Sequence, residues 1–246
     1  MRGDILEIAN ELRLITDTQL FWDRIGTELK KYGITSFLYS AAASRYEVED
    51  RGLMASLIIK NNYSQKYFDE FGEDTFLIDD LTAVRALHDA TPIIWHDESN
   101  WDDATPMQLA HAHAETEIGF GVGVTIPTVA IAPGHIGGIG LCAGDLTTSE
   151  FNSMWEAQSN RIMHILSYLD FGMRQTHLPK IIGLSKREKE VLSWLAGGLR
   201  PDQIADRLGI GYRTVDKYIN SAKSKLHATT RDNAVAKALI FNVIQP

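Results

Sequence analysis

Residues 201–220 constrain the fold most, because their small and apolar positions require two helices to cross closely. Pro201 suits the first position of a helix, and Gly209 permits the left-handed backbone that a short turn needs. Ala205 is small enough to let a second helix pass near the first, and Val215 returns that second helix to the shared core. The spacing therefore predicts a helix-turn-helix.

The polar side of the second helix suits contact with a nucleic acid. The N-terminal part of such a helix meets base edges, while flanking basic side chains hold phosphates. The predicted DNA contacts are Arg200, Arg213, Thr214, Val215, Lys217, Tyr218, Ser221, Lys223 and Lys225. The same pattern is also compatible with a small helical domain that binds proteins and leaves a charged face in solvent.

The charge is distributed unequally along the chain, and this favours DNA. The whole chain has a net charge of −8, but residues 184–246 contain 11 Lys and Arg against 6 Asp and Glu, which gives +5. The preceding residues contain 13 basic and 26 acidic side chains, which gives −13. This asymmetry predicts a small polyanion-binding domain attached to an acidic partner domain.

The composition argues for a folded protein of the cytoplasm that is not an enzyme. The chain of 246 residues is 44% hydrophobic, yet no apolar run reaches the roughly 18 residues that a membrane span needs. Cys142 is the single cysteine, so neither an internal disulfide nor a thiolate metal cluster can form. His111 and Glu115 lie one helical turn apart but supply only two ligands, so we expect no metal and no cofactor. No local signature of a catalytic triad is present.

The remaining patterns mix helices and strands without a regular alternation. They predict helices over residues 5–31, with a polar break at 16–18, and over 63–71, 82–89, 105–117 and 147–173, and strands over 34–42, 52–59, 122–126 and 136–142. Such an order favours an α+β chain, with an N-terminal α/β/α sandwich around an antiparallel sheet and an all-α, four-helix domain after it. The predicted domains are 1–174 and 184–246, joined by a linker over 175–183 that contains a proline and a glycine.

The C-terminal segment resembles the DNA-binding domain of LuxR-type regulators. The resemblance extends over residues 184–246 and is carried by residues 184–192, 204–205, 213–215, 225–226 and 231–238. Tyr218 departs from the histidine that is usual in that family. The resemblance implies a homodimer that binds an inverted-repeat promoter site in double-stranded DNA, with dimer contacts on the helix over 233–240.

The N-terminal segment resembles the autoinducer-binding domain of quorum-sensing regulators over roughly residues 15–170. Asp80 lies 15 residues before Trp95 and Gly123 lies 28 after it, which is the family's spacing. Residues 120–127, which include Thr125, match the family's central strand. The resemblance implies an N-acyl-homoserine lactone as ligand.

The resemblance also implies a role for each matched residue. Asp80 would accept a hydrogen bond from the ligand amide, and Trp95 would pack against the lactone ring. Gly123 would leave space for the ligand, Thr125 belongs to the matched strand, and Tyr63 would line the acyl chain.

Three positions depart from the family pattern. Tyr67 replaces a tryptophan that donates to the lactone carbonyl, Phe71 replaces a tyrosine, and Leu81 replaces a proline. Losing one neutral hydrogen bond costs about 0.5–1.5 kcal/mol. The departures leave open an orphan regulator that binds DNA without a lactone or with another ligand, and one that acts through protein partners alone. The aromatic residues are equally compatible with plain core packing.

Overall fold

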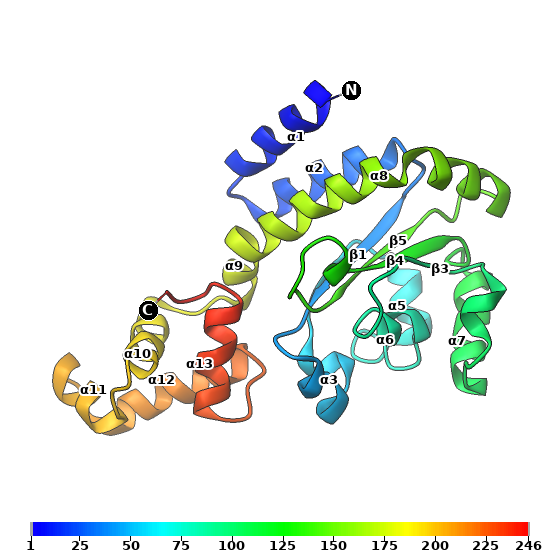
Figure 1. Ribbon diagram of the computed structural model, residues 1–246. Coiled ribbons are helices and arrows are strands. Elements are labelled where there is room, and N and C mark those ends of the chain that lie inside the picture. Colours follow the sequence, from blue (N-terminus) through cyan, green and yellow to red (C-terminus); the bar gives the residue numbers. More distant parts are fainter. Residues whose placement is uncertain (1, 246) are drawn as a thin grey trace. The chain divides into compact units, whose positions relative to one another are not determined.

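The computed structural model describes residues Arg2–Gln245, with side chains from Leu6 onward, and forms two compact units (Figure 1). The first unit ends at Asp170 and the second begins at Phe171. Each unit is described below by itself.

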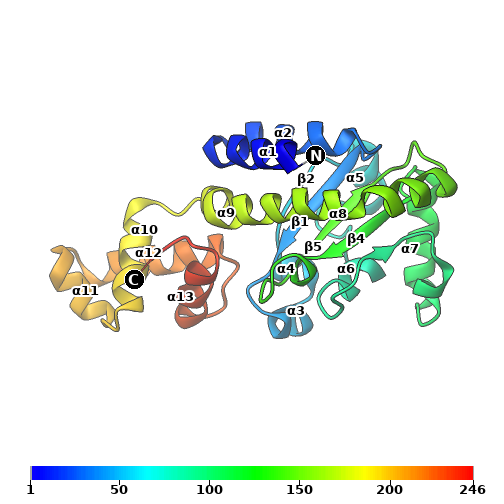
Figure 2. The same ribbon diagram turned by 45° about the horizontal axis from the view of Figure 1, so that its top comes forward.

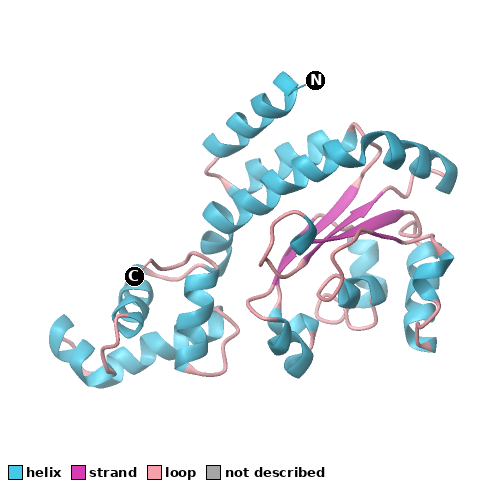
Figure 3. Ribbon diagram, in the orientation of Figure 1, coloured by secondary structure: helices cyan, strands magenta, loops and turns pink. Residues whose placement is uncertain are grey.

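The first unit contains a five-stranded sheet in the order β2-β1-β5-β4-β3 (Figure 3). All neighbouring strands are antiparallel, as predicted. The strands are β1 (Ser36–Ala41), β2 (Ile58–Asn61), β3 (Ile93–Ile94), β4 (Gly123–Pro127) and β5 (Gly138–Cys142).

Helices cover both faces of this sheet. The helices of this unit are α1 (Arg2–Leu14), α2 (Thr18–Lys30), α3 (Arg45–Arg51), α4 (Leu53–Ser56), α5 (Gln65–Phe71), α6 (Leu81–Arg85), α7 (Pro106–Glu117) and α8 (Thr148–Gly172), with short 3-10 turns at Glu98–Trp101 and Thr128–Ala130. Helices α2 and α8 lie on one face of the sheet, and α5 and α6 lie on the other (Figures 1 and 2). The predicted α/β/α sandwich is therefore confirmed.

The alternation of side chains along β1 explains why both faces are covered. Phe37 stacks on Trp22 of α2 with ring centres 4.1 Å apart, and the hydroxyl of Tyr39 donates to Asp170 of α8 at 2.8 Å. Leu38 and Ser40 point the opposite way, because successive side chains of a strand alternate between faces. One face of β1 thus meets the long helices, and the other lines a cavity.

The central strands β4 and β5 divide their side chains by size. Val124, Ile126, Ile139 and Leu141 are fully buried and alternate with glycine and threonine positions along the two strands. Large apolar groups thus fill one face, while the small residues leave room beside the other. This division creates the space for the cavity described below.

The second unit is helical throughout most of its length. A π-helical turn (Met173–His177) continues into α9 (Leu178–Ile182), which is followed by α10 (Lys186–Ala196), α11 (Pro201–Leu208), α12 (Tyr212–Lys225) and α13 (Arg231–Ile240). Gly209 ends α11 with the left-handed backbone (φ 64°) that the sequence predicts. Val191, Ile204, Ala205, Val215 and Ile219 form the buried core between α10, α11 and α12.

Some predicted elements differ in detail. The strand predicted over 52–59 is wrong in its first half, because Gly52, with φ of 81°, ends α3 and begins the short helix α4. The helix predicted over 5–31 is two helices, because the Asp17 side chain caps α2 by accepting from the backbone N–H of Leu20 at 2.8 Å. The segment 175–183, expected as a linker, is helical to Ile182.

The part of the chain that the structure describes contains neither a membrane-spanning helix nor a metal-binding cluster. No described helix is both long and apolar enough to cross a membrane. No three or more His, Cys, Asp or Glu side chains in this range are grouped so that they could hold a metal ion.

Gly137 provides a test of the close approach between β5 and β1. Its φ is 144°, and a Cβ atom there would overlap the carbonyl oxygen of Ser40. Gly134 also has a positive φ, of 85°, but open space around it. Urea unfolding should show Gly137→Ala to be less stable than Gly134→Ala by about 1–3 kcal/mol, since only the first adds a clash. Equal effects would contradict the packing described here.

Candidate functional site

A cavity of about 460 Å³ lies against the sheet in the first unit. This volume falls within the roughly 300–1,000 Å³ of small-molecule sites. The lining residues come from β1, β4 and β5, from helices α6 and α7, and from the loops between them. They are Leu38, Ser40, Tyr63, Leu77, Asp80, Thr82, Ala83, Trp95, His96, Glu98, Trp101, Leu109, Ala112, His113, Glu115, Thr116, Phe120, Gly121, Thr125, Gly138 and Gly140.

Glycines in the central strands keep this space open. A Cβ atom at Gly140 would lie 3.2 Å from the Tyr63 hydroxyl, and one at Gly123 would come within 2.5 Å of the Trp95 ring. Gly123 is therefore needed for the position of Trp95 beside β4. Gly123 was predicted to leave space for the ligand. In this structure the Trp95 indole ring occupies the space that Gly123 leaves.

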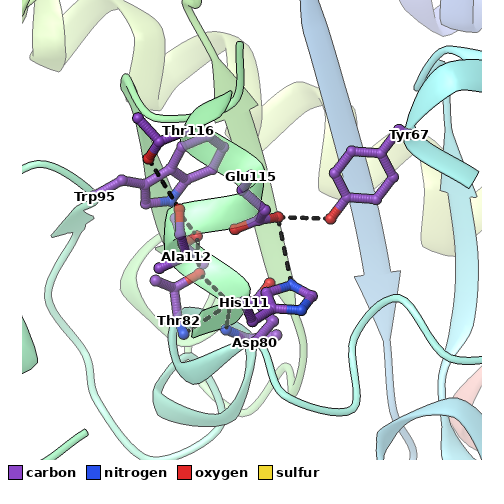
Figure 4. A network of polar contacts seen from close by, with 10 residues as sticks. Tyr67, Asp80, Thr82, Trp95, His111, Ala112, Glu115 and Thr116 are labelled. Carbon is purple, nitrogen blue, oxygen red and sulfur yellow. Dashed lines mark hydrogen bonds and ion pairs between the residues drawn. The ribbon is translucent and has the colours of Figure 1, made fainter. Parts of the chain in front are cut away.

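A directed chain of hydrogen bonds runs along one wall of the cavity (Figure 4). The indole N–H of Trp95 donates to Oγ1 of Thr125 at 2.8 Å, and the hydroxyls of Thr125 and Thr82 are 2.8 Å apart. The Thr82 hydroxyl donates to Oδ1 of Asp80 at 2.8 Å. An indole can only donate and a carboxylate can only accept, so the Thr125 hydroxyl must donate to Thr82. The chain ends on Asp80.

Asp80 is also the N-cap of helix α6. Its Oδ1 accepts from the backbone N–H groups of Thr82 at 2.8 Å and Ala83 at 3.1 Å. Among the described side chains, which begin at Leu6, and the described backbone, no donor is directed at Oδ2. Burial, followed by the charge of Glu115, raises the pKa of Asp80 to about 6, although the hydrogen bonds from Thr82 and Ala83 oppose the rise. Oδ2 is thus a strong acceptor left for a ligand.

A second carboxylate, that of Glu115 on α7, faces the same cavity. The hydroxyl of the buried Tyr67 donates to its Oε1 at 2.6 Å, and Nε2 of His111 lies 3.6 Å from the same oxygen (Figure 4). Burial opposes a charge on His111, but Glu115 and other carboxylates raise its pKa overall. Phe71 packs on both neighbours, with ring centres 4.8 Å from Tyr67 and 4.5 Å from His111.

The structure divides the predicted ligand contacts into two groups. Tyr63, Asp80, Trp95 and Thr125 line the cavity together. Tyr67, Phe71 and Gly123 lie behind this first layer and support Glu115, His111 and Trp95.

Sequence analysis missed several polar lining residues, of which Thr82 and Glu115 matter most for the hydrogen bonds described above. Thr82 lies two residues after Asp80, where an N-cap side chain accepts from the backbone N–H. This spacing could have indicated that Thr82 lies beside Asp80. Nothing in the sequence pairs Glu115 with Tyr67, because 48 residues separate them.

In the second unit, the exposed side of α12 forms the candidate DNA-binding face. Arg213 and Lys217 are exposed one helical turn apart, and Asn220 continues the row. Asn220 was not among the predicted contacts, although its spacing from Lys217 could have indicated it. Lys223, Thr214 and Tyr218 are half-buried at the edges of this row.

Other predicted DNA contacts have partners within the unit. The prediction that Val215 contacts DNA is wrong, because its side chain is fully buried in the core. Arg200 pairs with Asp202 at 3.0 Å on the surface.

Glu188 of α10 holds the remaining two, Ser221 and Lys225, on α12. It accepts from the Ser221 hydroxyl at 2.6 Å and from Nζ of Lys225 at 2.8 Å. Burial raises the pKa of Glu188, but the hydrogen bonds from Lys225, Ser221 and Ser185 outweigh burial and lower it to about 2. This buried carboxylate therefore fixes α12 against α10.

Asp80 should make the unliganded protein less stable as the pH rises. Its pKa is about 6 in the folded protein against 3.8 ordinarily, so the folded state binds the proton more tightly than the unfolded state. The free energy of unfolding should consequently fall between about pH 4 and pH 6. Asp80→Asn keeps an acceptor for the cap and removes this slope, so its melting temperature at pH 7.5 should exceed that of the wild type. Asp79→Asn is the control, and an unchanged slope in Asp80→Asn would contradict the assignment.

Comparison with known proteins identifies families for both units. Residues 17–169 match the autoinducer binding domain, and residues 183–238 match the bacterial regulatory proteins of the luxR family. The transcriptional activator VanR of Vibrio anguillarum is 24% identical over 192 residues, which cover 77% of this chain and 78% of VanR. The transcriptional activator AnoR of Acinetobacter nosocomialis is 21% identical over 249 residues, which cover 97% of this chain and 95% of AnoR.

Solved structures share the fold. The crystal structure of Escherichia coli SdiA superposes with a TM-score of 0.55 at 17% identity and covers 99% of both chains. SdiA in complex with octanoyl-rac-glycerol gives 0.53 at 16% identity, covering 99% of this chain and 97% of that one. The autoinducer-binding match extends over more than half of the chain and the luxR match follows it. The chain therefore belongs to the LuxR-type quorum-sensing transcriptional regulators.

Proposed function

We propose that this regulator binds an N-acyl amide in the cavity of its first unit and, as a homodimer, binds an inverted-repeat promoter site. The N-acyl-homoserine lactones, which the family implies, belong to this class of amides. Oδ2 of Asp80 carries the proposal, because this carboxylate oxygen faces a cavity and accepts nothing from the described chain. A ligand that fills the cavity removes this oxygen from water, and an acceptor left without a donor is then costly, so the site selects a ligand that brings an N–H group.

The remainder of the cavity suits an acyl chain. Leu38, Leu77, Leu109 and Phe120 supply apolar surface around the polar wall. A ligand that fills this space removes apolar surface from water, which is worth roughly 25 cal/mol per Å². The amide thus provides orientation, and the acyl chain provides much of the affinity.

The second unit supplies the proposed output. In a homodimer, two copies of α12 would enter successive major grooves, about one DNA turn apart. The row of Arg213, Lys217 and Asn220 offers base-edge and phosphate contacts. Such a DNA target implies a cytoplasmic protein, and we propose no catalytic role and no cofactor besides the ligand.

Ligand binding should stabilise the protein through Asp80. A probe such as N-octanoyl-homoserine lactone at 100 times its Kd should add about 2.7 kcal/mol. For a chain of this size the melting temperature should rise by roughly 5–10 °C. We choose the octanoyl chain because the ligand in the SdiA complex carries the same acyl group. In Asp80→Asn the rise should shrink by at least half, because the side-chain oxygen stays with the cap and an NH2 group, which cannot accept a hydrogen bond, takes the position of Oδ2.

Asp79→Asn serves as the control for this experiment, since it removes a neighbouring carboxylate that does not line the cavity. It should keep the full rise. If no N-acyl amide raises the melting temperature of the wild type, or if Asp80→Asn responds fully, the proposed ligand site is wrong.

The basic side chains of α12 should contribute to DNA affinity through phosphates. Lys217→Ala/Lys223→Ala should weaken binding to an inverted repeat selected from random DNA. The slope of log K against log salt is negative, and each lost phosphate contact reduces its magnitude by about 0.9. Fluorescence anisotropy at several salt concentrations measures this slope. Lys66→Ala, on α5 of the first unit, should leave it unchanged, and an unchanged slope in the double variant would exclude α12 as the DNA-binding helix.

A further inference from the structure

Three hydrogen-bond donors in or directly behind the cavity wall are committed to the protein. The Trp95 indole N–H donates to Thr125, and the Trp101 indole N–H donates to the Trp95 carbonyl at 2.8 Å. The Tyr67 hydroxyl, at the position where a lactone-binding relative would offer a donor, donates to Glu115 at 2.6 Å. Since each of these groups has one hydrogen to give, none remains for an acceptor on a ligand head group.

The acceptors, in contrast, are available. Asp80 keeps Oδ2, and the carboxylate of Glu115 has one oxygen, Oε2, to which no donor within residues 6–245 is directed. The lining contains acidic side chains but no Lys or Arg among the described residues. Tyr63 remains as a neutral donor, because burial raises the pKa of its phenol. The Tyr63 hydroxyl can therefore donate to one acceptor of a ligand, such as an amide carbonyl.

We propose that Glu115 selects ligands whose head group carries a hydrogen-bond donor, either an ammonium or a hydroxyl, over those with an acceptor-only lactone ring. This inference rests on the proposed function and names the head group that the same site takes. A carboxylate shielded from water attracts a donor strongly and repels a carbonyl oxygen, because the local dielectric constant is low. The side chain of Glu115 is 18% exposed, so it is largely shielded.

The protein groups around Glu115 do not remove its preference for a ligand that carries a donor. Tyr67 and His111 both approach Oε1, with His111 too distant, at 3.6 Å, for a hydrogen bond. His113, which lines the cavity while His111 does not, is largely exposed and lies 3.6 Å from Glu117, so it approaches a different carboxylate. The partners of Glu115 within the protein thus gather on one oxygen and leave the other toward the ligand.

The test uses three probes that share an octanoyl amide and differ only in the head group. They are N-octanoyl-1,2-diaminoethane with an ammonium, N-octanoylethanolamine with a hydroxyl, and N-octanoyl-homoserine lactone. Isothermal titration of the full chain should give the ammonium and hydroxyl probes at least tenfold higher affinity than the lactone. Glu115→Gln should lower the affinity for the ammonium probe at least tenfold and leave the lactone unchanged or tighter.

Two further variants separate head-group selection from a structural role. Glu117→Gln lies on the same helix, does not line the cavity, and should keep the order of affinities. Tyr67→Phe removes the phenol hydroxyl but keeps the carboxylate, so it should retain the preference for donors. Asp80→Asn should weaken all three probes alike, because it acts on the shared amide.

The outcomes distinguish the two proposals. Tighter binding of the lactone by the wild type, or an equal loss for all probes in Glu115→Gln, would overturn the head-group inference and leave the amide site standing. Absence of binding for every probe to the wild type would instead overturn the proposed function itself.

Discussion

The hydrogen-bond chain from Trp95 through Thr125 and Thr82 to Asp80 organises the first unit. It joins β4 to the start of α6 and uses every donor along its path in one direction. Because the chain can only end on an acceptor, it holds the Asp80 carboxylate in place before any ligand arrives. The cavity exists beside it because Gly138 and Gly140 leave the sheet face open.

The second unit also depends on buried charges, which fix the C-terminal end of α12. Glu188 holds Ser221 and Lys225 toward α10, and the buried Lys237 of α13 donates to the carbonyls of Leu226 and His227 at 3.1 and 2.9 Å. A cation at the C-terminal end of a helix also interacts favourably with the helix dipole. These contacts keep the exposed face of α12 in a defined orientation within its unit.

Much of the fold could be predicted because local signals agree with it. The turn at Gly209 and the polar break at 16–18, where Asp17 caps α2, both act within a few residues. The prediction of a strand at 52–59 was wrong because its apolar composition suits a strand, whereas Gly52 permits a helix to begin there. Composition alone could not predict the positive φ of Gly52 that allows the helix to begin there.

The candidate site could be predicted only in part, for a related reason. Asp80 and Trp95 stood out through spacing within a family pattern. The role of Glu115 arises from a contact between α5 and α7 that no local pattern encodes. Val215 illustrates the converse, because it was predicted both as a core residue and as a DNA contact, and its complete burial leaves only the place in the core.

The central claim is that Oδ2 of Asp80 receives the N–H of an acyl amide. A crystal structure of the full chain with a bound N-octanoyl amide tests it most directly. The account predicts electron density in the cavity with the amide nitrogen about 2.9 Å from Oδ2, a normal N–H···O distance. An amide bound elsewhere in the protein, or a cavity that stays empty at saturating ligand, would contradict it.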